Sequence, residues 1–188
     1  MRGRRTSVAA VVLALLAGAG PARADDYLED PQPREGLMLS FGLGPALFVG
    51  LGNYSDFRAP GGSGMLRLGS KASQLVTFIV QTENMGFLRE DPVTRVDSTQ
   101  AFSINTLGVM LFVRERFWLR SGVGFASVSE DDRQGRTLDN GLGLTGALGY
   151  DVRRWGRWAI NFELGSATGM MGNGSLTLFL LRVAATYY

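Results

Sequence analysis

The last fourteen residues of the chain, from Ser175 to Tyr188, read SLTLFLLRVAATYY. In a β-strand successive side chains point to opposite faces, so apolar residues at every second position share one face. One face is formed by Phe179, Leu181, Val183, Ala185 and Tyr187. The other face includes Arg182, Ala184 and Thr186. No turn residue follows, so the sequence ends on a strand, which is stable when both strand edges are paired, as in a closed barrel.

The first 24 residues have the three-part pattern of a secretory signal peptide. Three arginines precede an apolar run from Val8 to Ala19, and Ala22 to Ala24 match a small-x-small cleavage site. The apolar run has about a dozen residues, whereas a transmembrane helix needs about 20. We expect cleavage after Ala24, a polar lead-in over residues 25–35, and one folded domain over residues 36–188.

Composition excludes several classes of function. After position 24 the chain has 15 basic and 17 acidic residues, so its net charge there is −2, although the whole sequence carries +2. A slightly acidic chain gives no basis for nucleic-acid binding. The sequence contains no cysteine and no histidine. It therefore lacks disulfides, thiolate metal sites, the commonest metal ligand and the commonest general base.

Alternation of apolar with small or polar residues recurs from residue 36 to the end and predicts eight strands. We place them at residues 36–44, 64–70, 74–83, 100–113, 117–127, 141–152, 157–165 and 175–188. Short turns near residues 71, 115 and 155 alternate with long loops at 45–62, 84–99, 128–140 and 166–174. A change of phase near Thr106 predicts a β-bulge in the fourth strand.

Two kinds of barrel fit eight alternating strands: a soluble barrel with apolar residues inside, and a membrane barrel with apolar residues outside. An eight-stranded barrel has room for only modest side chains within. Here the bulky apolar residues share one face, and the other collects small residues and single charges. The sequence therefore predicts an all-β, eight-stranded antiparallel up-and-down transmembrane β-barrel. The residues that we predict to face lipid are Leu142, Leu144, Leu148, Ile160, Phe162, Leu164, Phe179, Leu181 and Val183.

Over residues 36–188 the chain resembles the small outer-membrane barrel families of the OmpA membrane domain, OmpX and OmpW. The resemblance rests on the signal peptide, the strand rhythm, the alternation of loop lengths and the terminal aromatic residue, with no motif specific to one family. It implies a porin-like barrel in the outer membrane of a Gram-negative-type envelope. It also implies outer-membrane lipids and the barrel-insertion machinery as partners, with Tyr187 and Tyr188 as the terminal insertion signal.

The polar face predicts one candidate site, a network of polar and charged side chains inside the lumen. Charges buried in a narrow lumen should pair and hydrogen-bond with one another. We assign Arg67, Gln81, Arg120, Asp151, Glu163 and Arg182 to this network. We expect it to close or gate the lumen, and closure by packing is the simpler outcome in a barrel this narrow.

No pattern indicates catalysis, a cofactor or a resident metal. The acidic run at residues 130–132 is typical of solvated surface, although it has the ligand type of a weak calcium site. Gly172 to Gly174 lacks the lysine and helix of a phosphate-binding loop. Enzymes among the small outer-membrane barrels rely on a histidine, which is absent here.

We predict a non-enzymatic protein with a structural or surface-interaction role and an unknown ligand for its long loops. The alternative is a small passive channel for apolar or small polar solutes.

Overall fold

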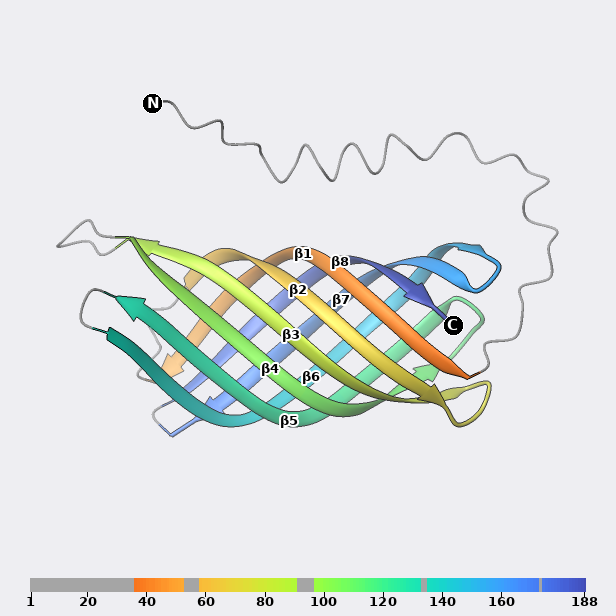
Figure 1. Cartoon of the computed structure of the whole chain (residues 1–188), viewed down its shortest axis with the longest axis horizontal. Helices are drawn as coiled ribbons and strands as arrows, with labels where there is room; N and C mark the ends of the chain where they lie inside the picture. The colour runs from red at the N-terminus through yellow and green to blue at the C-terminus, as the bar shows by residue number, and fades with distance from the viewer. Residues whose placement is uncertain (1–35, 53–57, 91–96, 133–134, 173) are drawn as a thin grey trace, which may run out of the picture. The chain divides into compact units, whose positions relative to one another are not determined.

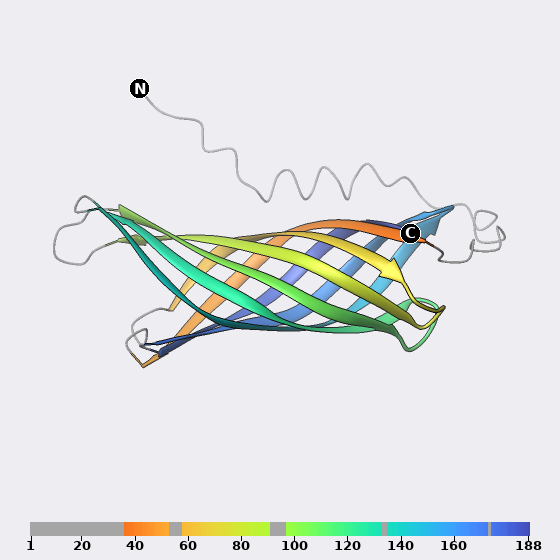
Figure 2. The ribbon, with the colours of Figure 1, turned by 60° about the horizontal axis from the view of Figure 1, so that its bottom comes forward.

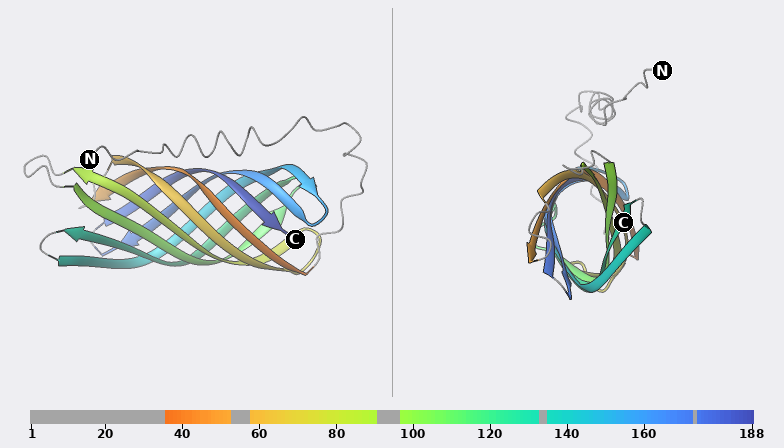
Figure 3. Two further views of the ribbon diagram at one scale, coloured as in Figure 1. Left: turned by 45° about the horizontal axis from the view of Figure 1, so that its top comes forward. Right: turned by 90° about the vertical axis from the view of Figure 1, so that its left-hand side faces the viewer.

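The computed structural model describes residues 36–52, 58–90, 97–132, 135–172 and 174–188. They form eight strands, β1 (Leu37–Gly52), β2 (Arg58–Lys71), β3 (Val76–Glu90), β4 (Asp97–Phe112), β5 (Phe117–Asp132), β6 (Gly135–Trp155), β7 (Trp158–Met171) and β8 (Gly174–Tyr187) (Figure 1). Each strand pairs antiparallel with the next, and β1 pairs with β8, so the sheet closes into the ring seen end-on in Figure 3. The predicted eight-stranded antiparallel barrel is confirmed. In the described part of the chain, no helix has the length and hydropathy needed to span a membrane.

The strands are longer than the sequence predicted. β1 continues through Pro45 to Gly52, and β6 has 21 residues. Much of each predicted long loop is therefore strand, because the backbone pairing continues past the point where the apolar alternation fades. The ladder between β1 and β8 contains no pair at Gly44 or Pro45 and resumes at Ala46 in the same register. A proline has no N–H to donate, so a local gap in an otherwise continuous ladder is expected there.

The predicted bulge near Thr106 is wrong. The register of β4 with both of its neighbours is unbroken from end to end, and Phe102, Ile104 and Thr106 all face the interior. The apparent change of phase arises because the large apolar side chains in the first half of β4, such as Phe102 and Ile104, point inward, whereas those in the second half point both ways. Leu107 and Leu111 face outward, and Met110 and Phe112 face inward. The register shift in the sheet lies instead in β6, between Asp151 and Arg153, beside a tight turn.

The pairing register advances steadily around the barrel. Followed from Met38 through all eight strands, it returns to β1 at Phe48, ten residues further along. Such a stagger requires strands tilted by roughly 35–45° from the barrel axis, and the oblique strands are clear in Figure 2. We call the end with the three tight turns and Tyr188 the turn end, and the opposite end the loop end.

The outer wall is apolar. All nine residues predicted to face lipid lie on it, with between 37% and 54% of their surface exposed. Large apolar side chains exposed around a whole barrel are the reverse of what a soluble barrel presents to water.

Gly44 provides a test of the closure between β1 and β8. A Cβ atom at this position would overlap the backbone carbonyl oxygen of Leu181. Backbone cannot turn aside as a flexible side chain can, so we expect Gly44→Ala to lower the free energy of unfolding by about 1–3 kcal/mol. Denaturant unfolding in phospholipid vesicles measures the change. Gly62→Ala is the matched control, because the space around its Cβ is open. Equal destabilisation by the two substitutions would contradict the close approach.

Candidate functional site

The inward-facing side chains fill the lumen in three layers. The loop-end cluster consists of Ala46, Phe48, Met85, Phe102, Ile104, Ala126, Val128, Ala167, Met171, Leu176, Leu178 and Leu180. The turn-end cluster consists of Met38, Ile79, Met110, Phe112, Trp118, Ala159 and Tyr188. Charged and polar side chains lie between these two apolar clusters, so the polar layer is covered from both ends.

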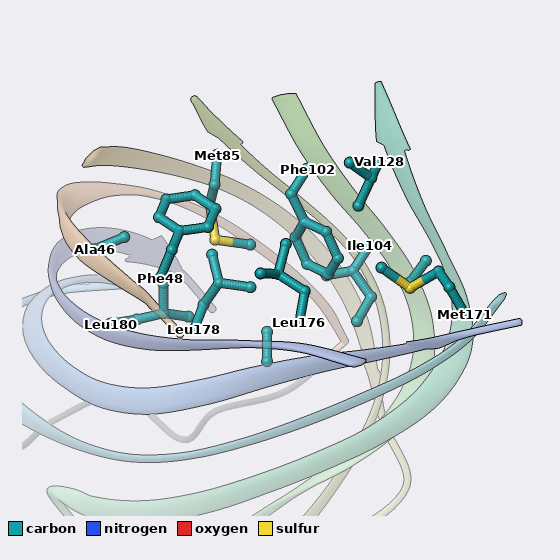
Figure 4. Packing of buried hydrophobic residues seen from close by; sticks show 12 residues of the cluster. Ala46, Phe48, Met85, Phe102, Ile104, Val128, Met171, Leu176, Leu178 and Leu180 are labelled. Carbon is teal, nitrogen blue, oxygen red and sulfur yellow. The ribbon is translucent and has the colours of Figure 1, made fainter. Parts of the chain in front are cut away.

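The loop-end cluster contradicts the expectation that bulky apolar residues stay on the outer face. In Figure 4 Phe48, Phe102 and Leu178 point into the space enclosed by the strands, and each is fully buried. Small inward-facing residues leave space for these large side chains. At Gly169, for example, a Cβ atom would collide with the ring of Phe102. The loop half of the lumen is therefore packed like the core of a soluble protein.

The middle layer contains five buried charges, which we call the arginine–glutamate network: Arg67, Arg120, Arg182, Glu83 and Glu163. Arg67 Nη2 donates to Glu163 Oε2 at 2.7 Å, and Arg120 Nη2 donates to Glu83 Oε1 at 2.7 Å and also contacts Glu163. Arg182 Nη2 donates to Glu83 Oε2 at 2.8 Å, and its Nη1 lies 3.6 Å from Glu163. These contacts join β2, β3, β5, β7 and β8 across the lumen.

Uncharged side chains extend the network sideways. Gln81 accepts from Arg67 Nε at 3.2 Å through its Oε1. Its Nε2 donates to Glu83 at 2.9 Å and to Thr145 Oγ1 at 3.3 Å. Gln81 thereby links a guanidinium, a carboxylate and a sixth strand, β6, in one connected group.

The network has more donors than acceptors. Three arginines face two glutamates, so the five charges sum to +1. The Nη1 atoms of Arg67, Arg120 and Arg182 are buried without a hydrogen-bond acceptor. Each carboxylate therefore compensates more than one guanidinium, and the loss of either would leave buried positive charge with still less compensation.

Five of the six residues assigned to the lumen network lie together: Arg67, Gln81, Arg120, Glu163 and Arg182. Asp151 lies apart, in the turn-end layer, where it accepts hydrogen bonds from Trp118 Nε1 at 3.3 Å and Tyr188 Oη at 3.5 Å. Its link to the network runs through Trp118, whose ring lies 5.4 Å below the guanidinium carbon of Arg67.

Glu83 is the member that sequence reasoning left out. It lies two residues after Gln81 on the same face of β3, so the period-two alternation already put it in the lumen. The sequence did not show at which position along the barrel axis Glu83 would lie. That position depends on the stagger of the strands, which brings Glu83 level with Arg120 and Arg182.

The two terminal tyrosines face opposite sides of the wall. Tyr187 is half-buried on the outside, edge-on to Trp158 with ring centroids 5.3 Å apart. Tyr188 is buried in the turn-end cluster, edge-on to Phe112 at 6.0 Å. Arg157 holds this end of the chain: its Nε donates to the Tyr188 carbonyl oxygen, and its own carbonyl accepts from the Tyr188 N–H.

Among the described residues there is no group of three or more potential metal-ligating side chains. The side chains of the acidic run at residues 130–132 lie outside the described part, so the possible calcium site there stays an untested expectation.

The similarity to known proteins is one of fold. No protein-family model matches the sequence, and no curated protein sequence matches it. Ail, the attachment invasion locus protein of Yersinia pestis, in complex with the heparin analogue sucrose octasulfate, aligns with a TM-score of 0.60 and 12% identity, over 81% of this chain and 99% of Ail. Neisserial surface protein A aligns with a TM-score of 0.60 and 13% identity, over 81% of this chain and 97% of that protein. The chain therefore has the fold of small eight-stranded outer-membrane barrel proteins.

Proposed function

We propose that this chain is a non-enzymatic integral protein of the outer membrane of a Gram-negative-type envelope, with a closed lumen and a structural or surface-interaction role. The observation that carries the proposal is the arginine–glutamate network, which crosses the lumen from five strands between two apolar clusters. From this packing we infer that the lumen has no continuous water path, so that contacts with other molecules fall to the outer wall and the loops.

The outer wall supports the membrane location. A β-barrel in lipid must satisfy its backbone groups between strands and present apolar side chains outward. The closed ladder and the exposed leucines, valines and phenylalanines meet both requirements. Lipids of the outer membrane are thus the proposed solvent of this wall. We also propose that the barrel-insertion machinery recognises the terminal strand.

The charge of the loop segments limits the kind of surface ligand. Sequence segments 45–62, 84–99 and 128–140 together hold five basic and eight acidic residues. Ail has been crystallised with a sulfated heparin analogue, but an acidic excess disfavours a polyanion here. A neutral or cationic partner is the better match for the loop end of this chain.

Conductance tests the closed lumen. Purified protein added to a planar phospholipid bilayer is expected to produce no stable single-channel steps, as with detergent alone. Steady steps of uniform size would contradict closure and favour the passive channel. In that case Glu163→Ala shows whether the network is the gate, because loss of the carboxylate would then change the size or the lifetime of the steps.

Electrophoretic mobility tests the barrel and its location. Protein extracted from the membrane fraction is expected to migrate differently before and after boiling, because a closed barrel resists detergent until it is heated. Recovery of the protein in the soluble periplasmic fraction, with no boiling-dependent shift, would contradict the membrane location.

A further inference from the structure

The apolar outer wall is much shorter on one side of the barrel. We count outward-facing residues from the turn end of each strand and call each position a level. On β8 the first five levels are apolar or aromatic: Tyr187, Ala185, Val183, Leu181 and Phe179. The first five levels of β1 are also apolar: Leu37, Leu39, Phe41, Leu43 and Pro45. On β3 and β4 the apolar residues stop after three levels.

The fourth and fifth levels of β3 and β4 form a polar patch: Thr82, Asn84, Ser103 and Asn105. Thr82 Oγ1 donates to Asn105 Oδ1 at 2.7 Å, and Ser103 Oγ donates to Asn84 Oδ1 at 2.7 Å. Both asparagines are exposed on the outer wall. In Figure 1 β2, β3 and β4, yellow to green, run side by side along one part of the barrel.

Glycine flattens the wall beside this polar patch. Gly64 of β2 pairs with Asn84, and Gly62 pairs with Gly86 of β3. No atom lies within 4 Å of a Cβ placed at Gly62 or Gly86. The wall of β2–β4 at these levels is therefore shallow, and its projecting side chains are short and polar. Phe125 of β5, which pairs with Asn105 and is 80% exposed, borders this region.

The polar patch lies within the height of the apolar band that β8 and β1 define. Successive levels are two residues apart, which at the tilt of this barrel is about 5 Å along its axis. The first and fifth levels are four steps apart, or about 20 Å, so all five fit within the usual lipid-facing height of about 25 Å. Amides held at the fourth and fifth levels would thus meet hydrocarbon, where an unsatisfied polar group is costly.

We propose that the lipid interface meets the barrel lower along β2–β4 than along β8 and β1, with lipid ester carbonyl oxygens binding the polar patch. This inference rests on the proposed membrane location. Each asparagine uses Oδ1 to accept from a neighbouring hydroxyl, which leaves its amide NH₂ to donate outward. Ester carbonyls accept hydrogen bonds and cannot donate them, so they complement these donors. The bilayer beside this wall is thinned by up to two levels.

A lipid fits the polar patch better than a second protein does. A stable protein interface buries about 800 Å² on each partner and contains large anchoring side chains. The polar patch has four short side chains bordered by glycines of β2, and a large side chain, Phe125 of β5, lies only at its edge, where it pairs with Asn105.

A matched pair of probes tests the proposal. The natural sequence has no cysteine, and Val80 and Val183 are both exposed valines at the third level, on β3 and β8. Val80→Cys and Val183→Cys, each carrying a fluorophore, are reconstituted into dioleoylphosphatidylcholine vesicles doped with lipids brominated at different acyl depths. We expect the probe at 80 to be quenched most by shallow bromines and the probe at 183 by deep ones.

A variant of the polar patch sharpens the result. In the background T82V/N84L/S103A/N105L, we expect the quenching maximum of the probe at 80 to move to the deep position, while that of the probe at 183 stays. Equal depths at both positions in the natural background would overturn the proposal. So would a probe at 80 shielded from every brominated lipid and from aqueous iodide, since a protein partner would then cover the wall. If lipid quenches neither probe, the membrane location itself fails.

Discussion

Glu163→Ala is expected to lower the free energy of unfolding by about 3–5 kcal/mol, the usual cost of removing one partner from a buried ion pair. Glu163 compensates Arg67 and Arg120, and its carboxylate is also near Arg182. Its removal leaves three buried guanidinium groups facing Glu83 alone. Urea unfolding in phospholipid vesicles, followed by tryptophan fluorescence, measures the change as a shift in the unfolding midpoint.

Two further variants separate loss of the network from loss of any acidic residue. Glu115→Ala removes an exposed carboxylate at a tight turn and should change stability by no more than about 0.5 kcal/mol. The double variant Arg67→Leu/Glu163→Leu removes one positive and one negative charge together, and it should be more stable than Glu163→Ala. If Glu163→Ala unfolds at the same midpoint as the natural protein, the network does not hold the barrel together.

Phe162→Arg is expected to cost about 2–4 kcal/mol in lipid, the penalty for an arginine near the bilayer midplane on the outside of a barrel. Phe162 is the third outward residue of β7 from the turn end and is 44% exposed. In a soluble barrel the same substitution would replace an exposed apolar side chain with a hydrated one at little cost. Unfolding in phosphatidylcholine vesicles therefore distinguishes the two environments of the outer wall.

Met170→Arg is the control on the same strand and face. Met170 is 40% exposed but lies near the loop end of β7, where an arginine reaches the interface and costs about 0–1 kcal/mol. A penalty that is similar at positions 162 and 170 would contradict a depth-dependent lipid environment.

Much of the architecture was readable from the sequence because most strands carry apolar side chains at alternate positions on their outward face. Period-two alternation marks such a strand without reference to its neighbours, so the strand count, the antiparallel order and the outward-facing residues followed. The ends of the strands did not follow. Beyond the apolar band both faces carry mixed residues, and pairing continues there through backbone hydrogen bonds that leave little trace in the side chains.

The lumen shows the limit of the same reasoning. The period-two alternation placed Arg67 and Glu163 on the inward face, but these residues are 96 positions apart in the sequence. Which inward residues contact one another depends on the ten-residue stagger of the closed sheet. That stagger brings Glu83 into the network and keeps Asp151 at the turn end with Trp118. It also stacks Phe48, Phe102 and Leu178 into one cluster.

The sequence by itself determined the strands and their faces, because those depend on local alternation. Only the tertiary structure decided how the lumen is filled, because that depends on the height at which distant strands face each other.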